Sequence, residues 1–141
     1  MDKNTKNEWN AWINRSISDY RSAEKLISGE DKYLDTAIFH CQQAAEKILK
    51  SFLVYKNVKF EKVHNIVYLI DKCVEIEKSF EKLYSAAEIL TPYATMFRYP
   101  GDYAEPDIID VKEALEYARR IVNFILNIYI ENNDYTGEEL S

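Results

Sequence analysis

The sequence contains few of the residues that turn or cross-link a polypeptide. Its 141 residues include only three Gly, three Pro and two Cys. So few turn-forming residues leave little material for β-hairpins, whereas 47% hydrophobic and 30% charged residues suit amphipathic helices. We therefore predict an all-α fold, and this length is enough for one domain.

Long apolar runs and paired cysteines are missing as well. No stretch approaches the roughly 20 apolar residues that a membrane-spanning helix needs, and the first residues lack the pattern of a secretory leader. Cys41 and Cys73 stand alone on apolar helical stripes, where a free thiol behaves as a small core residue. We expect a soluble, cytoplasmic protein with no metal site and no cofactor.

Negative charge dominates the sequence, with a net charge of −6 and a pI of about 5.0. This balance argues against a protein that coats nucleic acid through a general positive field. One local exception is a group of five lysines between Lys47 and Lys62, opposed by Glu61 alone. The group is either a solvated helix end and loop or a local anion contact.

Apolar residues recur at intervals of three and four in five segments, which predicts five helices. The expected ranges are 8–28, 33–55, 66–76, 80–97 and 108–131. Asn65 and Asp107 are suited to cap the third and fifth helices, and Pro92 should bend the fourth helix without ending it. Such helices can bury their stripes only against each other, so we predict an up-and-down bundle over residues 1–131 and an acidic, flexible tail over 132–141.

The fifth predicted helix has an apolar band too wide for a helix that is covered on one side only. Residues outside its main stripe include Ile121, Phe124 and Leu126. The helix therefore either lies centrally in the bundle or forms part of a subunit interface. We expect self-association.

Candidate functional residues gather around "TMFRYPGDYAEPD", residues 95–107, where Arg98 precedes a Tyr-Pro-Gly turn and Asp102 and Tyr103 follow. Arg98 either favours a helix C-terminus through the helix dipole or contacts an anion such as a phosphate. A second group, His40, Gln43, Lys47 and Lys50, shares one polar face of the second predicted helix, and His64 precedes the third. No Gly-rich phosphate loop, zinc-ligand spacing or nucleophile elbow is present.

Three segments in this order, "AIFHCQQAAEKILKSFLVYKN", "KVHNIVYLIDKC" and "MFRYPGD", resemble a HEPN domain (higher eukaryotes and prokaryotes nucleotide-binding). The resemblance extends from about Trp9 to Ile130. It implies a bundle of four or more helices, frequent symmetric dimers, and pairing with a minimal nucleotidyltransferase in toxin–antitoxin-like systems. In some such proteins a tyrosine near the motif is modified by nucleotide transfer, and Tyr103 is the candidate here.

Many HEPN proteins are metal-independent RNases whose signature is an arginine followed four to six residues later by a histidine. Arg98 matches the arginine, but the expected histidine is missing, and Tyr103 stands at the fifth position. A phenol with an ordinary pKa near 10 transfers protons poorly at neutral pH. The missing histidine therefore argues more strongly against catalysis than against ligand binding.

We therefore expect a homodimer that binds a nucleotide or another phosphate-bearing ligand through Arg98, Asp102, Tyr103, His64 and Lys47. Two alternatives remain open. One is an RNase in which His40 or His64 replaces the motif histidine, and the other is a protein-interaction module without a small ligand.

Overall fold

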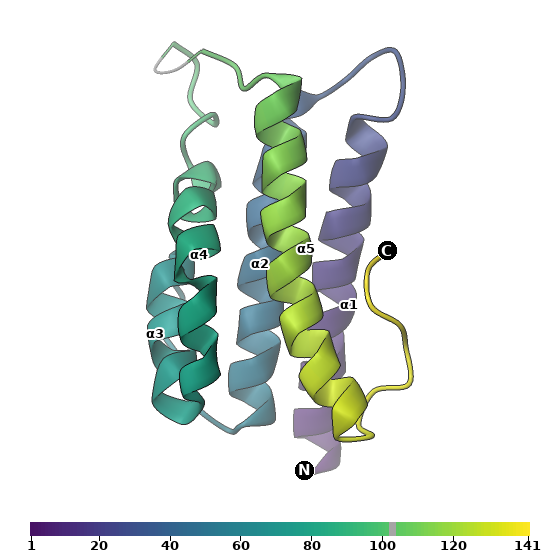
Figure 1. Cartoon of the computed structure of the whole chain (residues 1–141), viewed down its shortest axis with the longest axis vertical. Coiled ribbons are helices and arrows are strands. Elements are labelled where there is room, and N and C mark those ends of the chain that lie inside the picture. Colours follow the sequence, from purple (N-terminus) through teal and green to yellow (C-terminus); the bar gives the residue numbers. More distant parts are fainter. Residues whose placement is uncertain (102–103) are drawn as a thin grey trace.

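In a computed structural model, which describes residues 1–101 and 104–141, the regular elements of those residues are all helical (Figure 1). The five α-helices are α1 (Lys3–Leu26), α2 (Leu34–Tyr55), α3 (Ile66–Ile76), α4 (Tyr84–Leu90) and α5 (Ile108–Glu131). Two 3₁₀ turns, η1 (Lys78–Leu83) and η2 (Thr91–Ala94), flank α4. The prediction of an all-α helical bundle is confirmed.

Side-chain caps fix where three of the helices begin. The Asn65 side chain accepts from the backbone of Tyr68 at 3.1 Å, and Asp107 forms a reciprocal capping box with Asp110. The first helix begins at Lys3 and not near residue 8 as expected, because Asp2 caps it at 2.8 Å. A cap outside the apolar periodicity extended this helix by more than one turn.

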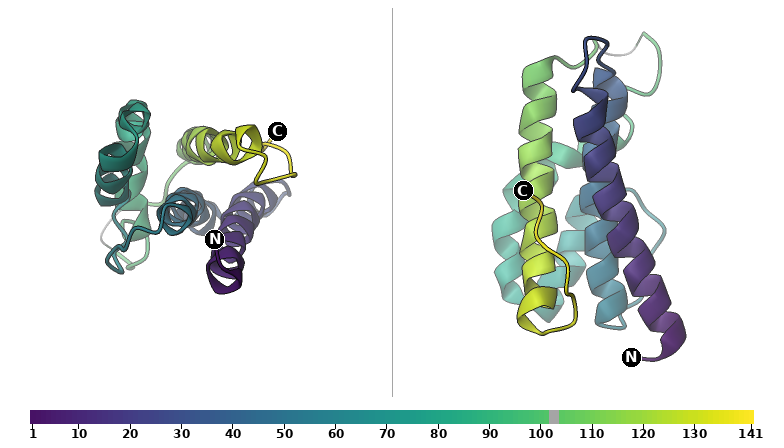
Figure 2. Two further views of the ribbon diagram at one scale, coloured as in Figure 1. Left: turned by 90° about the horizontal axis from the view of Figure 1, so that it is seen from below. Right: turned by 90° about the vertical axis from the view of Figure 1, so that its right-hand side faces the viewer.

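The second helix forms the centre of the bundle. It packs against α1, α3 and α5, and these helices surround it in the end-on view of Figure 2. Of its 22 residues only Thr36 is exposed. Because α2 is covered on nearly every side, its polar residues must also meet other helices.

The helical region around Pro92 is continuous but changes type. The α-helix ends at Leu90, and the chain goes on through η2 with Leu90 and Thr91 both in right-handed helical geometry. Pro92 lies at the start of η2, where its missing N–H is not needed for an internal helical bond. The expected bend is thus a switch to a tighter 3₁₀ turn, and the helical run ends at Ala94, before residue 97.

The C-terminal segment after α5 lies against the bundle (Figures 1 and 2). Leu140 is only 4% exposed, and its backbone N–H and C=O bond the Asn123 side chain of α5 at 2.7 and 3.0 Å. On α5 itself Ile121 and Leu126 are buried, so part of the wide apolar band is covered within one chain. Self-association and flexibility of residues 132–141 stay predictions.

Neither a membrane span nor a metal centre is present in the described residues. No helix there combines the length and hydropathy needed to cross a bilayer, and residues 1–101 and 104–141 contain no cluster of three or more His, Cys, Asp or Glu suited to a metal ion. Cys41 and Cys73 are both buried, and burial raises the pKa of the Cys41 thiol to about 12. Such thiols stay protonated and poorly nucleophilic at neutral pH.

Candidate functional site

Arg98 lies in the connection between η2 and α5, and its side chain reaches the first turns of α2. Its backbone N–H donates to the Thr95 carbonyl at 3.1 Å, and the chain then turns at Gly101, whose φ of +88° favours glycine. The guanidinium carbon lies 4.5 Å from the centroid of the Phe39 ring. This cation–π contact gives an exposed guanidinium a defined direction.

Two adjoining hollows surround Arg98, and we call them together the Arg98 cleft. One has a volume of about 350 Å³ and the other about 370 Å³. Asp35 and Phe97 border both; His40 belongs to the first and Glu105 to the second. The combined space is on the scale of small-ligand sites.

The charges of the cleft are mixed. Within residues 1–101 and 104–141, no carboxylate lies within ion-pair distance of the Arg98 guanidinium, although Asp35 and Glu105 border the same space. Asp35 already accepts the Thr36 backbone N–H at 2.8 Å. An anion in the cleft would therefore gain most by placing its charge directly at Arg98 and away from the two acids.

The histidine of the cleft is oriented by a carboxylate from another helix. His40 Nδ1 lies 2.7 Å from Asp19 Oδ1, and the second oxygen of Asp19 lies 2.6 Å from Lys47 Nζ. The Asp19 side chain is 10% exposed and the His40 side chain 28%. With Nδ1 facing the carboxylate, Nε2 is the ring nitrogen that remains for a ligand.

The polar face of α2 that carries His40, Gln43, Lys47 and Lys50 is largely covered by other parts of the chain. Gln43 and Lys50 are buried, and Lys47 is only 20% exposed. The reason is the central place of α2, because α1 and the segment before α3 cover this face as well.

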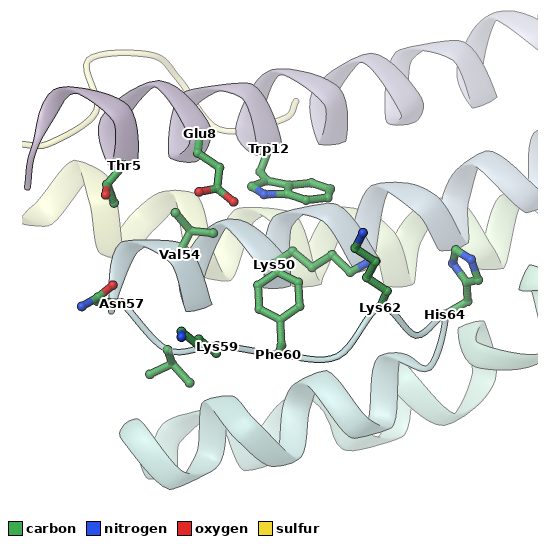
Figure 3. A pocket seen from close by; sticks show the side chains of 11 residues that line it. Thr5, Glu8, Trp12, Lys50, Val54, Asn57, Lys59, Phe60, Lys62 and His64 are labelled. Carbon is green, nitrogen blue, oxygen red and sulfur yellow. The ribbon is translucent and has the colours of Figure 1, made fainter.

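His64 belongs to a different hollow from Arg98. Its Nδ1 lies 3.1 Å from the Glu46 carboxylate, which is 2% exposed and also bonds Lys50 Nζ at 3.0 Å and Gln42 Nε2 at 3.1 Å. His64 lines a space of about 680 Å³ together with Trp12 and Lys50 (Figure 3).

The five residues expected at one ligand site thus take different places. Arg98 lines the Arg98 cleft, Lys47 reaches it only indirectly through Asp19 and His40, and His64 lies at the other hollow. Asp102 and Tyr103 are outside the described residues. Of the two histidines considered for the missing motif position, it is His40 that shares a hollow with Arg98.

Two contributors to the cleft were not singled out from the sequence. Asp19 is an acid on the buried face of α1, between Ser16 and Tyr20, and an acid in such a position indicates a buried cationic partner. Phe39 carried no comparable signal. Its role depends on where the segment after η2 places Arg98, which local periodicity does not specify.

The comparisons with known proteins agree with this architecture. The model of the HEPN domain matches residues 9–129. The crystal structure of TT1696 from Thermus thermophilus is similar with a TM-score of 0.73 and 26% identity, covering 86% of this chain and 98% of that one. ST0689, an archaeal HEPN homologue, is similar with a TM-score of 0.66 and 26% identity, covering 85% and 96%. No curated protein matches the chain. Since the family match extends over most of the chain and the bundle agrees with it, this protein belongs to the HEPN domain family.

Proposed function

We propose that this HEPN-domain protein binds a nucleotide or another phosphate-bearing ligand in the Arg98 cleft. The observation that carries the proposal is the exposed guanidinium of Arg98, stacked on Phe39 and sharing a hollow with His40. Guanidinium presents a planar fork of N–H donors that matches two phosphate oxygens. Stacking on the ring reduces the rotamer freedom that binding would otherwise remove.

His40 adds a second polar contact to the proposed site. The Asp19 carboxylate sets the imidazole orientation, so that Nε2 is directed away from Asp19 and remains to bond a phosphate oxygen or a ligand hydroxyl. Asp35 at the cleft border suits a ligand that also carries hydrogen-bond donors, such as the ribose hydroxyls or the exocyclic amine of a nucleotide. This combination favours a nucleotide over bare phosphate.

Calorimetric titration of ATP, AMP and inorganic phosphate tests the proposal. We expect Arg98→Ala to weaken nucleotide binding by about tenfold to a hundredfold, the loss of one charge-assisted contact. Arg98→Lys should recover only part of the affinity, since it keeps the charge and loses the fork. Arg15→Ala, which removes an exposed arginine of α1, is the matched control and should bind as the wild type does.

Absent heats for all three ligands, or equal affinities of wild type and Arg98→Ala, would contradict the proposal. A thermal shift measured with the same variants separates loss of binding from loss of fold. Since Arg98 is exposed, its replacement should leave unfolding almost unchanged.

The homodimer expected from the family resemblance is part of the proposal. Three exposed large apolar side chains support it: Tyr33 before α2, Tyr99 beside Arg98, and Ile109 in the first turn of α5. These three chain segments lie at one end of the bundle in Figure 1. Sedimentation of wild type and Tyr99→Ser/Ile109→Ser is the test, and a wild type that stays monomeric at high micromolar concentration would contradict the dimer.

A minimal nucleotidyltransferase is the partner that the family resemblance supports, in a toxin–antitoxin-like pairing. Reading the adjacent gene is the first test, and where it encodes a nucleotidyltransferase, co-expression followed by gel filtration tests the pairing. Co-elution supports it. The pairing would be contradicted if the two proteins elute separately and mass spectrometry detects no nucleotide attached to the HEPN chain.

Metal-independent RNA cleavage is a second candidate, favoured by the contact between Asp19 and His40 at the Arg98 cleft. In this reaction His40 Nε2 would take the proton of a 2′-hydroxyl, whose oxygen then attacks the adjacent phosphorus. A 2′,3′-cyclic phosphate forms while the bond to the 5′-oxygen breaks, and that oxygen takes up a proton. Arg98 would stabilise the charge that develops on the phosphate oxygens.

Incubation of structured RNA in EDTA tests this second candidate. Wild type should give fragments with 2′,3′-cyclic ends, and His40→Ala and Arg98→Ala should each slow cleavage by roughly a hundredfold. His64→Ala is the matched control, because His64 lies at a different hollow. Cleavage no faster than that of a mock preparation, or unchanged in His40→Ala, would exclude this activity.

A further inference from the structure

A second pocket lies between α1, the C-terminal half of α2 and the segment that joins α2 to α3 (Figure 3). We call it the Trp12 pocket. Its volume of about 680 Å³ is typical of small-molecule sites. Trp12 of α1 and Phe60 of the joining segment contribute aromatic rings, and Val54 and Val58 add apolar surface.

The charges of this pocket are opposite in sign to those of the chain as a whole. Three lysines, Lys50, Lys59 and Lys62, line it against one acid, Glu8, although the chain carries a net charge of −6. Lys50 is already paired with Glu46. Lys59 and Lys62 are exposed, and neither has a carboxylate at ion-pair distance within the described part of the chain. The pocket therefore offers two ammonium groups without an ion-pair partner in the described residues, against the single charge of Glu8, beside aromatic surface.

The inner wall of the pocket is held rigidly. Lys50 Nζ lies 5.4 Å from the centroid of the Trp12 ring and 5.9 Å from that of Phe60, and in Figure 3 its side chain lies between the two rings. Glu46 fixes this ammonium, and Gln42 and His64 in turn bond Glu46. Replacing a buried ion pair by apolar residues of similar volume is often neutral or stabilising, so the pair is weak evidence of a stabilising role, and what it does here is to fix the ammonium of Lys50 at the pocket wall.

We propose that the Trp12 pocket binds a small planar aromatic anion, with the ring against Trp12 and Phe60 and the carboxylate or phosphate at Lys59 or Lys62, which flank Phe60 in Figure 3. An aromatic ring gains from stacking and apolar burial, and an anionic group gains from a nearby ammonium group. An aromatic ring alone would leave the lysines without a partner, and an anionic group alone would leave the aromatic surface uncovered. The Trp12 pocket and the Arg98 cleft are separate sites, since no residue lines both.

A titration followed by ¹H–¹⁵N NMR tests the proposal. The chain has two tryptophans, Trp12 in the pocket and Trp9 in the core at 2% exposure, so two indole N–H signals report on the two environments. Addition of 2-naphthoate should move the Trp12 signal in a saturable way and the Trp9 signal less. 2-Naphthyl phosphate, which carries the same ring, serves as the phosphate-bearing arm, and the tighter of the two anions identifies the preferred anionic group.

Lys59→Gln/Lys62→Gln should weaken binding of 2-naphthoate by about tenfold or more, and Phe60→Leu, which keeps the Trp12 reporter, should also weaken it. Lys112→Gln, which replaces an exposed lysine of α5, is the matched control and should bind as the wild type does. Three results would overturn the proposal: no saturable shift at millimolar 2-naphthoate, equal affinity of the double lysine variant, or equal affinity for the uncharged 2-naphthalenemethanol. Both lysines are exposed, so loss of fold does not confound this variant.

Discussion

The imidazole of His40 is bonded by a carboxylate from another helix, with Asp19 Oδ1 2.7 Å from His40 Nδ1. The same carboxylate pairs with Lys47, which lies further along α2. Asp19 therefore joins α1 to α2 and also orients the only histidine lining the described part of the Arg98 cleft. Stability of the bundle and geometry of the cleft depend on one side chain.

Replacing Asp19 should lower the stability of the bundle and loosen the orientation of His40. Asp19→Asn keeps the shape of the side chain but removes the negative charge that bonds both His40 and Lys47. We therefore expect the free energy of unfolding to fall by about 2 kcal/mol. Urea unfolding measures this value, and Asp31→Asn, which replaces an exposed acid in the connection between α1 and α2, is the control. An unchanged midpoint would show that the contact contributes little in solution.

Alkaline pH should destabilise the fold through buried groups. Burial raises the pKa of the Tyr129 phenol above its ordinary value near 10, and raises that of the Cys41 thiol from 9 to about 12. Their stabilising contribution is complete below pH 9. It is lost as the pH rises toward the folded pKa values, because the unfolded chain releases these protons first.

Tyr129→Phe separates the phenol from the thiol. The Ser51 hydroxyl donates to the Ile48 carbonyl, so Tyr129 O–H donates to Ser51, and its removal should cost about 1 kcal/mol at pH 7. Above pH 10 the urea midpoint of the variant should fall less steeply than that of wild type. Parallel curves for the two proteins would mean that Tyr129 ionises as readily in the folded state as in the unfolded chain.

The attachment of the C-terminal segment is open to a direct measurement. Asn123→Ala removes both bonds to the Leu140 backbone, and we expect it to cost about 1 to 3 kcal/mol because the Leu140 peptide group loses its partners. Hydrogen exchange should show a protected Leu140 amide in wild type and fast exchange in the variant. Fast exchange in both would favour the flexible tail that the acidic composition of residues 132–141 suggests.

The start of α5 should depend on Asp107. Asp107→Ala removes the capping box with Asp110 and should lower the free energy of unfolding by about 1 kcal/mol. Asp107→Asn keeps a capping oxygen and should cost less. Circular dichroism during urea unfolding compares the two, and equal losses would argue against the cap as the cause.

The helical bundle could be predicted because apolar spacing and helix caps are local features of the sequence. Apolar spacing located the five helices, and Asn65 and Asp107 marked two of the starts. The details that were missed depend on other signals: the Asp2 cap lengthened α1, and the helical run around Pro92 continues as a 3₁₀ turn that ends at Ala94. The HEPN resemblance, carried by sequence motifs and not by periodicity, is confirmed by the family match.

The candidate site was less accessible to such reasoning, because it joins distant segments. Arg98 and His40 were each visible in the sequence, but that they share a hollow depends on how the segment after η2 packs on α2. Lys47 and His64 are likewise separated, since Lys47 of α2 bonds Asp19 of α1, whereas His64, just before α3, bonds Glu46 of α2. The roles of all these residues in ligand binding stay proposals.

The near-complete enclosure of α2 limits how this protein can diverge in sequence. With Thr36 as its one exposed position, almost any replacement in α2 changes a packed neighbour or an internal polar bond. The outer faces of α1 and α5 carry no such restriction, so new surface properties can arise there without rearranging the interior. Changes at the proposed ligand sites would instead have to come from the loops, the helix ends and the α1 residues that border α2.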